Sequence, residues 1–413
     1  MATVQLSFPI KRSSAGFFAA TGVIVSHCRC ARQSGPSTLR VLTVASWQVN
    51  HGSPCCNGQT FVPAITFRHP ATTSKLAMDN PEQGTLQELL NVNLETADST
   101  PHRAKRGQHA KHHGAVRAVF SIADNIPEDL RTGLFAKQGT YEAIIRFSNG
   151  SAADDRSADA HGMAIKLLDV PGEKLRDGQD QTMAQDFILV DSEVFFTGNL
   201  TEYLMFSAGF LRGRRNPLRK LLFGLRMFLF HRPLLRRALA FASNSPRSPL
   251  ESEYFSSVPY AFGHTAAKFV VKPRAPSKSS PELSSPDGLS KVLVSHLAAG
   301  SAIFDFGVDV QTDARTQPIE DPTVKWSVQA GARRAWVAVI TIPRQTVDPQ
   351  SLLAENIAFS PWHALAAHRP LGAINRARRP IYHDLAKKRH ELNGYRGDVA
   401  ESPRLDHATA PGA

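Results

Sequence analysis

Arg106-Gly107-Gln108-His109-Ala110-Lys111 is the stretch from which the fold of this 413-residue chain can be predicted. It precedes Gly114 to Phe120, where the pattern Ala-Val-Arg-Ala-Val-Phe is typical of a β-strand. A second predicted strand, Tyr141 to Phe147, runs into Ser148-Asn149-Gly150, which is a strong turn signal. A histidine therefore stands just before one predicted strand, and an arginine and a serine stand at the end of the next.

Further strand-like runs follow along the chain. They are Gly162 to Leu168, Asp186 to Val190, Ala267 to Val271, Ala302 to Val310, Lys325 to Val328 and Ala335 to Ile342. The eight predicted strands are unevenly separated, which favours a sheet-based or barrel core over a repeated βαβ unit.

A second group of polar residues lies near the C-terminus, on a helix predicted from Ile374 to Leu392 with Pro380 near its first turn or at a kink. Arg378, Tyr382 and Arg389 fall within about 40° of one another on its surface. Two guanidinium groups favour phenolate over phenol, and a phenolate is the form in which tyrosine binds ferric haem. The spacing alone also fits an exposed basic helix with one surface tyrosine.

Taken together, these segments resemble the motifs of monofunctional catalases, in the same order. The matching segments are His109-Ala110-Lys111, Arg146-Phe147-Ser148, Asp159-Ala160-His161-Gly162-Met163-Ala164-Ile165-Lys166, Asn356-Ile357-Ala358-Phe359-Ser360-Pro361, and Arg378 with Tyr382, Asp384 and Arg389. The resemblance covers about residues 105 to 392.

The resemblance implies an α+β fold, in which an antiparallel eight-stranded β-barrel with flanking helices surrounds a buried haem b. His109 would be the distal acid–base group, and Ser148 would orient it. Tyr382 would bind the iron, with Arg378 supporting its phenolate. The remaining residues expected to bind the cofactor are Arg106, Arg146 and Arg389, on the haem propionates, Phe195, stacked on the haem, and Phe359.

The chain departs from large catalases in two ways. It ends soon after the predicted helix that carries Tyr382. Residues 361–376 resemble the shorter catalase-related haem proteins, which include fatty-acid hydroperoxide lyases, allene oxide synthases and peroxidases. Aligning Asp191 with the family's aspartate places Met183 where catalases have a distal asparagine, and Gln185 could substitute only if the register slips. A methionine would make the pocket more apolar. We therefore expect an organic or fatty-acid hydroperoxide as substrate. The alternatives are a true catalase that decomposes hydrogen peroxide and a non-catalytic haem- or lipid-binding barrel.

Other cofactor chemistries are less well supported. His109, His112 and His113 could form a zinc site, but no acidic residue or fourth ligand lies nearby in the sequence. All four cysteines precede residue 57, so the rest of the chain has no disulfide and no thiolate ligand.

Most of the positive charge behind the net charge of +12 lies in two segments. The charge therefore gives no reason to expect a nucleic-acid partner. Residues 1–78 contain seven Lys or Arg and no Asp or Glu, a composition typical of an organelle transit peptide. We expect a plastid address, with the mitochondrion, or the cytoplasm if the leader is not a signal, as alternatives. The body then comprises an arm (79–105), the haem domain (106–395) and a polar tail (396–413).

The second basic segment is an insert at residues 203–250, with ten Lys or Arg and no acidic residue. Within it, Leu221 to Phe230 is apolar on nearly all sides. Such a segment can lie on an anionic membrane surface, whereas the simpler alternative is a buried helical hairpin whose arginines face solvent. No run of eighteen apolar residues occurs, and no pattern indicates the oligomeric state.

Overall fold

The computed structural model describes residues 81–175, 183–214, 216–275 and 283–395. The expected transit peptide (1–78) and polar tail (396–413) lie outside the described residues and stay predictions. Most of the expected arm is a helix, α1 (Pro81–Thr96).

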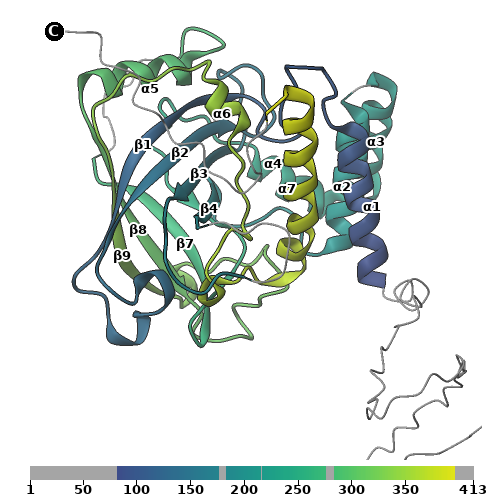
Figure 1. Cartoon of the computed structure of the whole chain (residues 1–413). Coiled ribbons are helices and arrows are strands. Elements are labelled where there is room, and N and C mark those ends of the chain that lie inside the picture. The colour runs from purple at the N-terminus through teal and green to yellow at the C-terminus, as the bar shows by residue number, and fades with distance from the viewer. Residues whose placement is uncertain (1–80, 176–182, 215, 276–282, 396–413) are drawn as a thin grey trace, which may run out of the picture. The chain divides into compact units, whose positions relative to one another are not determined.

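Nine strands form one antiparallel sheet that closes on itself (Figure 1). They are β1 (His112–Ile122), β2 (Thr140–Asn149), β3 (His161–Leu167), β4 (Gln185–Val190), β5 (Tyr254–Phe255), β6 (Tyr260–Phe262), β7 (Thr265–Pro273), β8 (Ala302–Val310) and β9 (Arg333–Ile342). Their order is β5-β4-β3-β2-β1-β9-β8-β7-β6, and β5 also pairs with β7. That second pairing closes an eight-stranded ring, to which β6 is added. The predicted eight-stranded antiparallel barrel is confirmed.

One of the predicted strands is wrong. Residues 325–328 lie in a loop that leads into a short 3-10 helix, Val328–Ala330. Trp326 is buried there in a small cluster with Ala266 and Ala332, and the ammonium of Lys268 lies 5.3 Å from the centre of its ring. Trp326 is buried because it packs on Ala266 of β7, and no strand pairing is involved. The short strands β5 and β6 were not predicted, since two or three residues show no alternation.

The interior of the barrel is filled by aromatic side chains. The ring centre of Phe306 lies 5.0 Å from that of Phe120 and 4.8 Å from that of Phe187, and the rings of Phe187 and Phe269 are 4.9 Å apart. Eight-stranded barrels are commonly just wide enough to be filled in this way. A large ligand must therefore bind outside the barrel.

Helices lie against one side of the barrel. They are α1, α2 (Leu200–Gly213), α3 (Pro217–Phe230), α4 (Arg232–Phe241) and α7 (Gly372–Asn393), whereas α5 (Gly288–Ala299) and α6 (Leu352–Asn356) lie near its upper end in Figure 1. Figure 1 shows α7 between the barrel and the layer formed by α1, α2 and α3. Pro380 is the ninth residue of α7 and lies beyond its first turn, and the helix begins two residues before the predicted start.

The basic insert forms α2, α3 and α4, and its prediction as a buried hairpin is wrong. Met227 is the fully buried residue of α3, while most of its leucines and phenylalanines are exposed to solvent. No helix among the described residues is long and apolar enough to cross a membrane.

Candidate functional site

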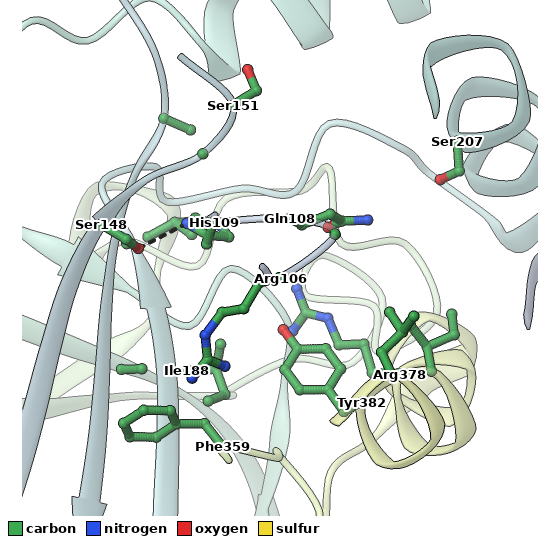
Figure 2. Close-up of a pocket in the computed structure, with 18 of the residues that line it drawn as sticks. Arg106, Gln108, His109, Ser148, Ser151, Ile188, Ser207, Phe359, Arg378 and Tyr382 are labelled. Carbon is green, nitrogen blue, oxygen red and sulfur yellow. Dashed lines mark hydrogen bonds between the residues drawn. The ribbon is translucent and has the colours of Figure 1, made fainter. Parts of the chain in front are cut away.

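A cavity between the barrel and the helices brings the predicted site residues together (Figure 2). Its lining includes Arg106, His109, Arg146, Ser148, Phe195, Phe359, Arg378, Tyr382 and Arg389, which are all nine residues selected from the sequence. The cavity and its opening contain about 1900 Å³ of space.

His109 is held in an uncommon backbone conformation. Its φ of 53° lies in the left-handed region, which non-glycine residues occupy at a cost and mainly at functional sites. The peptide N–H of His109 donates to the carbonyl of Gly150 at 2.9 Å, and the Arg146 side chain donates to the His109 carbonyl at 2.9 Å. The end of β2 therefore fixes the backbone of the histidine.

The imidazole of His109 is positioned by Ser148. Nδ1 of the ring lies 3.1 Å from the hydroxyl oxygen of Ser148. Burial, together with the positive charge of Arg146, lowers the pKa of His109 to about 4. The ring is thus neutral at physiological pH. If Nδ1–H donates to Ser148, Nε2 is left as a free proton acceptor.

Gly162 on β3 makes room for this pair. A Cβ atom at this position would lie 2.7 Å from Nδ1 of His109 and 2.9 Å from the Ser148 oxygen. The aspartate three residues earlier shapes the neighbouring loop, because its carboxylate accepts the N–H groups of Ser151 and Ala152 at 2.7 Å each. Asp159 and Gly162 were singled out in the sequence by motif alone, and the contacts give each a physical reason.

Three arginines converge on one side of the cavity, and of these Arg146 and Arg389 are buried and Arg106 is half-buried. Arg146 donates to the carbonyl of Ala354 at 2.9 Å, Arg106 donates to that of Ile357, and Arg389 lies 3.5 Å from that of Asn356. Their side chains converge from β2, from the segment before β1 and from α7. Backbone carbonyls of the α6 region therefore satisfy part of their hydrogen-bonding capacity.

The arginine cluster lacks full charge compensation. Burial is the main cause that lowers the pKa of Arg106, Arg146 and Arg389, and repulsion by Arg106 adds to it for the other two. The carboxylate of Glu355 opposes these shifts in all three. Nε of Arg106 and Nε of Arg389 are buried without a hydrogen-bond partner. Buried guanidiniums in this state favour an anionic ligand that can accept hydrogen bonds.

Haem fits these requirements. Its two propionate carboxylates would supply the negative charge that the three arginines lack, and its porphyrin ring would occupy the apolar part of the cavity. Arg106, Arg146 and Arg389 would hold the propionates, and Tyr382 would reach the iron.

Tyr382 and Arg378 lie on the cavity face of α7, as the helical spacing predicted (Figure 2). The phenol oxygen of Tyr382 points into the cavity near the Arg378 guanidinium. That guanidinium lies 5.3 Å from the ring centre of Phe195, and Nη1 of Arg378 is 3.5 Å from the side-chain oxygen of Asn375. These contacts orient Arg378 beside the phenol.

The two predicted phenylalanines differ in their surroundings. Phe359 lies between Arg106 and Lys166, whose charged groups are 5.9 and 5.5 Å from its ring centre. Phe195 belongs to an aromatic cluster with Phe196, Tyr203 and Phe241, and Arg378 covers part of it. Its stacking on a haem stays a prediction.

The assignment of Met183 to the distal asparagine position is wrong. Met183 precedes β4, is 55 % exposed and does not line the cavity. Gln185 is buried away from it and accepts the N–H of Leu365 at 2.9 Å. Ile188 is a β4 side chain that lines the cavity, since it pairs across the sheet with the lining residue Ala164. The error came from counting back from Asp191. The expected apolar character of this wall nevertheless holds.

The histidines near β1 do not converge on a metal ion. His113 bonds to Asn149 at 2.9 Å, and His112 faces Glu355 at 3.8 Å, while His109 faces Ser148. Among the described residues, no group of three His, Cys, Asp or Glu side chains could hold a metal.

An aromatic wall from the basic insert was not predicted. Phe206 and Phe210 on α2 and Phe241 on α4 line the cavity together with Tyr203 and Leu211. The sequence does contain a signal for it, because Tyr203, Phe206 and Phe210 recur at helical spacing in a segment without acidic residues.

The role of Gly162 can be tested by Gly162→Ala. The added methyl group should displace His109, break its contact with Ser148 and destabilise the protein by about 1–3 kcal/mol. Urea unfolding would measure the free energy, and a crystal structure would show the ring position. Gly139→Ala is the matched control, because a Cβ there makes only an ordinary contact at 3.4 Å. An unmoved His109 at full stability would contradict the packing argument.

Comparison with known proteins shows the fold. No protein-family model matches the chain, and no curated protein sequence matches it. Solved structures that are similar to it include two catalases. A fungal catalase gives a TM-score of 0.51 at 16 % identity, with 82 % of this chain and 68 % of that chain covered. A bacterial catalase gives a TM-score of 0.50 at 16 % identity, with 85 % and 70 % covered. The chain therefore has a catalase-like fold.

Proposed function

We propose that this protein is a haem-dependent enzyme that acts on organic or fatty-acid hydroperoxides, of the peroxidase, lyase or allene oxide synthase type. The observation that supports it most is the cluster of three under-compensated arginines beside Tyr382, in the same cavity as His109 and Ser148. That combination favours an anionic ligand and would provide an oxygen donor for its metal.

Haem would supply a ferric iron able to bind a hydroperoxide and to donate electron density to the O–O bond as it breaks. Tyr382 would hold the iron through its phenol oxygen, which points into the cavity near the Arg378 guanidinium. The arginine cluster would fix the propionates and hence the orientation of the ring in the cavity.

His109 would move a proton during the reaction. Its neutral ring can take a proton from the substrate's hydroperoxyl group and return it to the departing oxygen, while Ser148 holds the ring in one orientation. The hydrogen bonds that lock the His109 backbone keep the acceptor at one position in the cavity.

The walls of the cavity favour an apolar substrate. Ile188, Phe206 and Phe241 offer no hydrogen bond to a small polar molecule but can bury an acyl chain. A plastid address, expected from residues 1–78, would fit such a substrate. True catalase activity is the alternative, and the catalase-like fold favours it. A lipid carrier that binds inside the barrel is disfavoured, since phenylalanines fill that interior.

Substrate class can be tested by measuring oxygen release from hydrogen peroxide beside loss of the conjugated-diene absorbance of a fatty-acid hydroperoxide. We expect the second reaction to be faster. Ile188→Asn should shift the ratio toward hydrogen peroxide, because it adds a hydrogen-bonding amide to the wall, whereas the control Ile188→Val should not. Rapid oxygen release with an inert lipid hydroperoxide would identify a true catalase instead.

His109→Ala should keep haem, because Tyr382 and the propionate arginines remain, yet lower the rate of hydroperoxide consumption by ~10²–10⁴. Ser148→Ala should cost less than about tenfold, because it removes a single orienting hydrogen bond. The wild-type rate should fall as the pH drops through about 4, where His109 becomes protonated and can no longer accept a proton. His264→Ala, on the surface, is the control. Full activity in His109→Ala would rule out this role.

A further inference from the structure

We infer that the exposed apolar face of α3 docks on an anionic membrane surface. This face consists of Leu218, Leu221, Leu222, Leu225, Phe228 and Leu229, all of which are exposed. Leu221, for example, is 68 % exposed. Exposed apolar groups gathered on one face mark an interaction site more often than scattered ones do.

The packing of α3 determines which way this face points. Phe223 packs edge-on against Phe206 of α2, with ring centres 5.7 Å apart, and Met227 is buried. Gly209 of α2 permits this contact, because a Cβ there would lie 2.1 Å from the Phe223 ring. At 100° per residue, the centre of the leucine face lies about 180° from Phe223 and Met227. The apolar face is therefore directed away from the body of the protein, and Figure 1 shows α3 at the margin of the helical layer far from the barrel.

Positive charge borders this face. Arg219 and Arg226 fall about 100° from its centre, between the apolar side and the packed side. Both are exposed, as are Lys220, Arg232 and Arg236. Arginines at such a border can extend their charged ends to lipid headgroups while the leucines enter the acyl region.

The charges favour a membrane over a second copy of the chain. Residues 203–250 contain no Asp or Glu, so nothing within this segment balances its arginines. In a two-fold symmetric dimer through α3, the same arginines would face each other. Anionic lipids provide the complementary charge, and each basic residue near such a surface adds to the attraction.

Docking would place the cavity close to the membrane, since α2 and α4, the neighbours of α3, both line it. The idea that substrate enters the cavity from the membrane rests on the proposed function. The docking of α3 itself does not involve haem.

Vesicle sedimentation of the purified full-length protein tests the inference. We expect binding to vesicles that contain phosphatidylglycerol, much weaker binding to pure phosphatidylcholine, and release at high salt. Arg219→Gln combined with Arg226→Gln should weaken binding by roughly 25-fold, about fivefold for each charge. Leu221→Ser with Leu225→Ser should weaken it by roughly tenfold for each leucine.

Two matched controls are available. Lys137→Gln with Lys291→Gln removes two exposed charges elsewhere, and Val328→Ser removes an exposed apolar side chain. Neither should change binding. Equal binding by the α3 variants and the wild type would overturn the inference, because the basic leader would then account for it. A dimer in analytical ultracentrifugation that Leu221→Ser with Leu225→Ser dissociates would also overturn it and identify a second copy as the occupant.

Discussion

The partial or full burial of three arginines around one carboxylate is the constraint on which the site depends. Removing guanidinium groups from water is costly unless an opposite charge and hydrogen bonds replace the solvent. Backbone carbonyls of residues 354–357 and Glu355 replace part of it. A bound anion would replace the rest. The three arginines bring β2, the segment before β1, and α7 together at one point. The proposed haem, with its two carboxylates, would meet this need.

The packed barrel determines where that ligand can lie. Because Phe120, Phe187, Phe269 and Phe306 fill the interior, the barrel acts as a rigid support and the site forms on its outer side. Strand ends then position the reactive groups. Hydrogen bonds from the end of β2 hold His109 in a left-handed conformation, and α7 presents Tyr382 and Arg378 from the other side.

The resemblance to catalases predicted the eight-stranded barrel and most of the cavity residues, and the pattern of the sequence by itself supports only part of this prediction. Strands such as β8 alternate clearly, and Arg378, Tyr382 and Arg389 share a face through helical spacing. Prediction failed where tertiary context decides. The loop around Trp326 was predicted as a strand because it contains a buried aromatic residue. Met183 was assigned to the cavity by an alignment register that the structure does not follow, and the apolar leucines of α3 are exposed. Neither periodicity nor composition reveals which apolar face is left without a partner.

The absorption spectrum of the purified protein tests the central claim, that Tyr382 binds a haem iron, most directly. We expect a Soret band with one haem per chain. We also expect that Tyr382→Phe loses the haem or changes its charge-transfer bands, whereas Tyr203→Phe, at another tyrosine that lines the cavity, leaves them as in the wild type. A protein that takes up no haem on reconstitution would contradict the account, as would an unchanged spectrum in Tyr382→Phe.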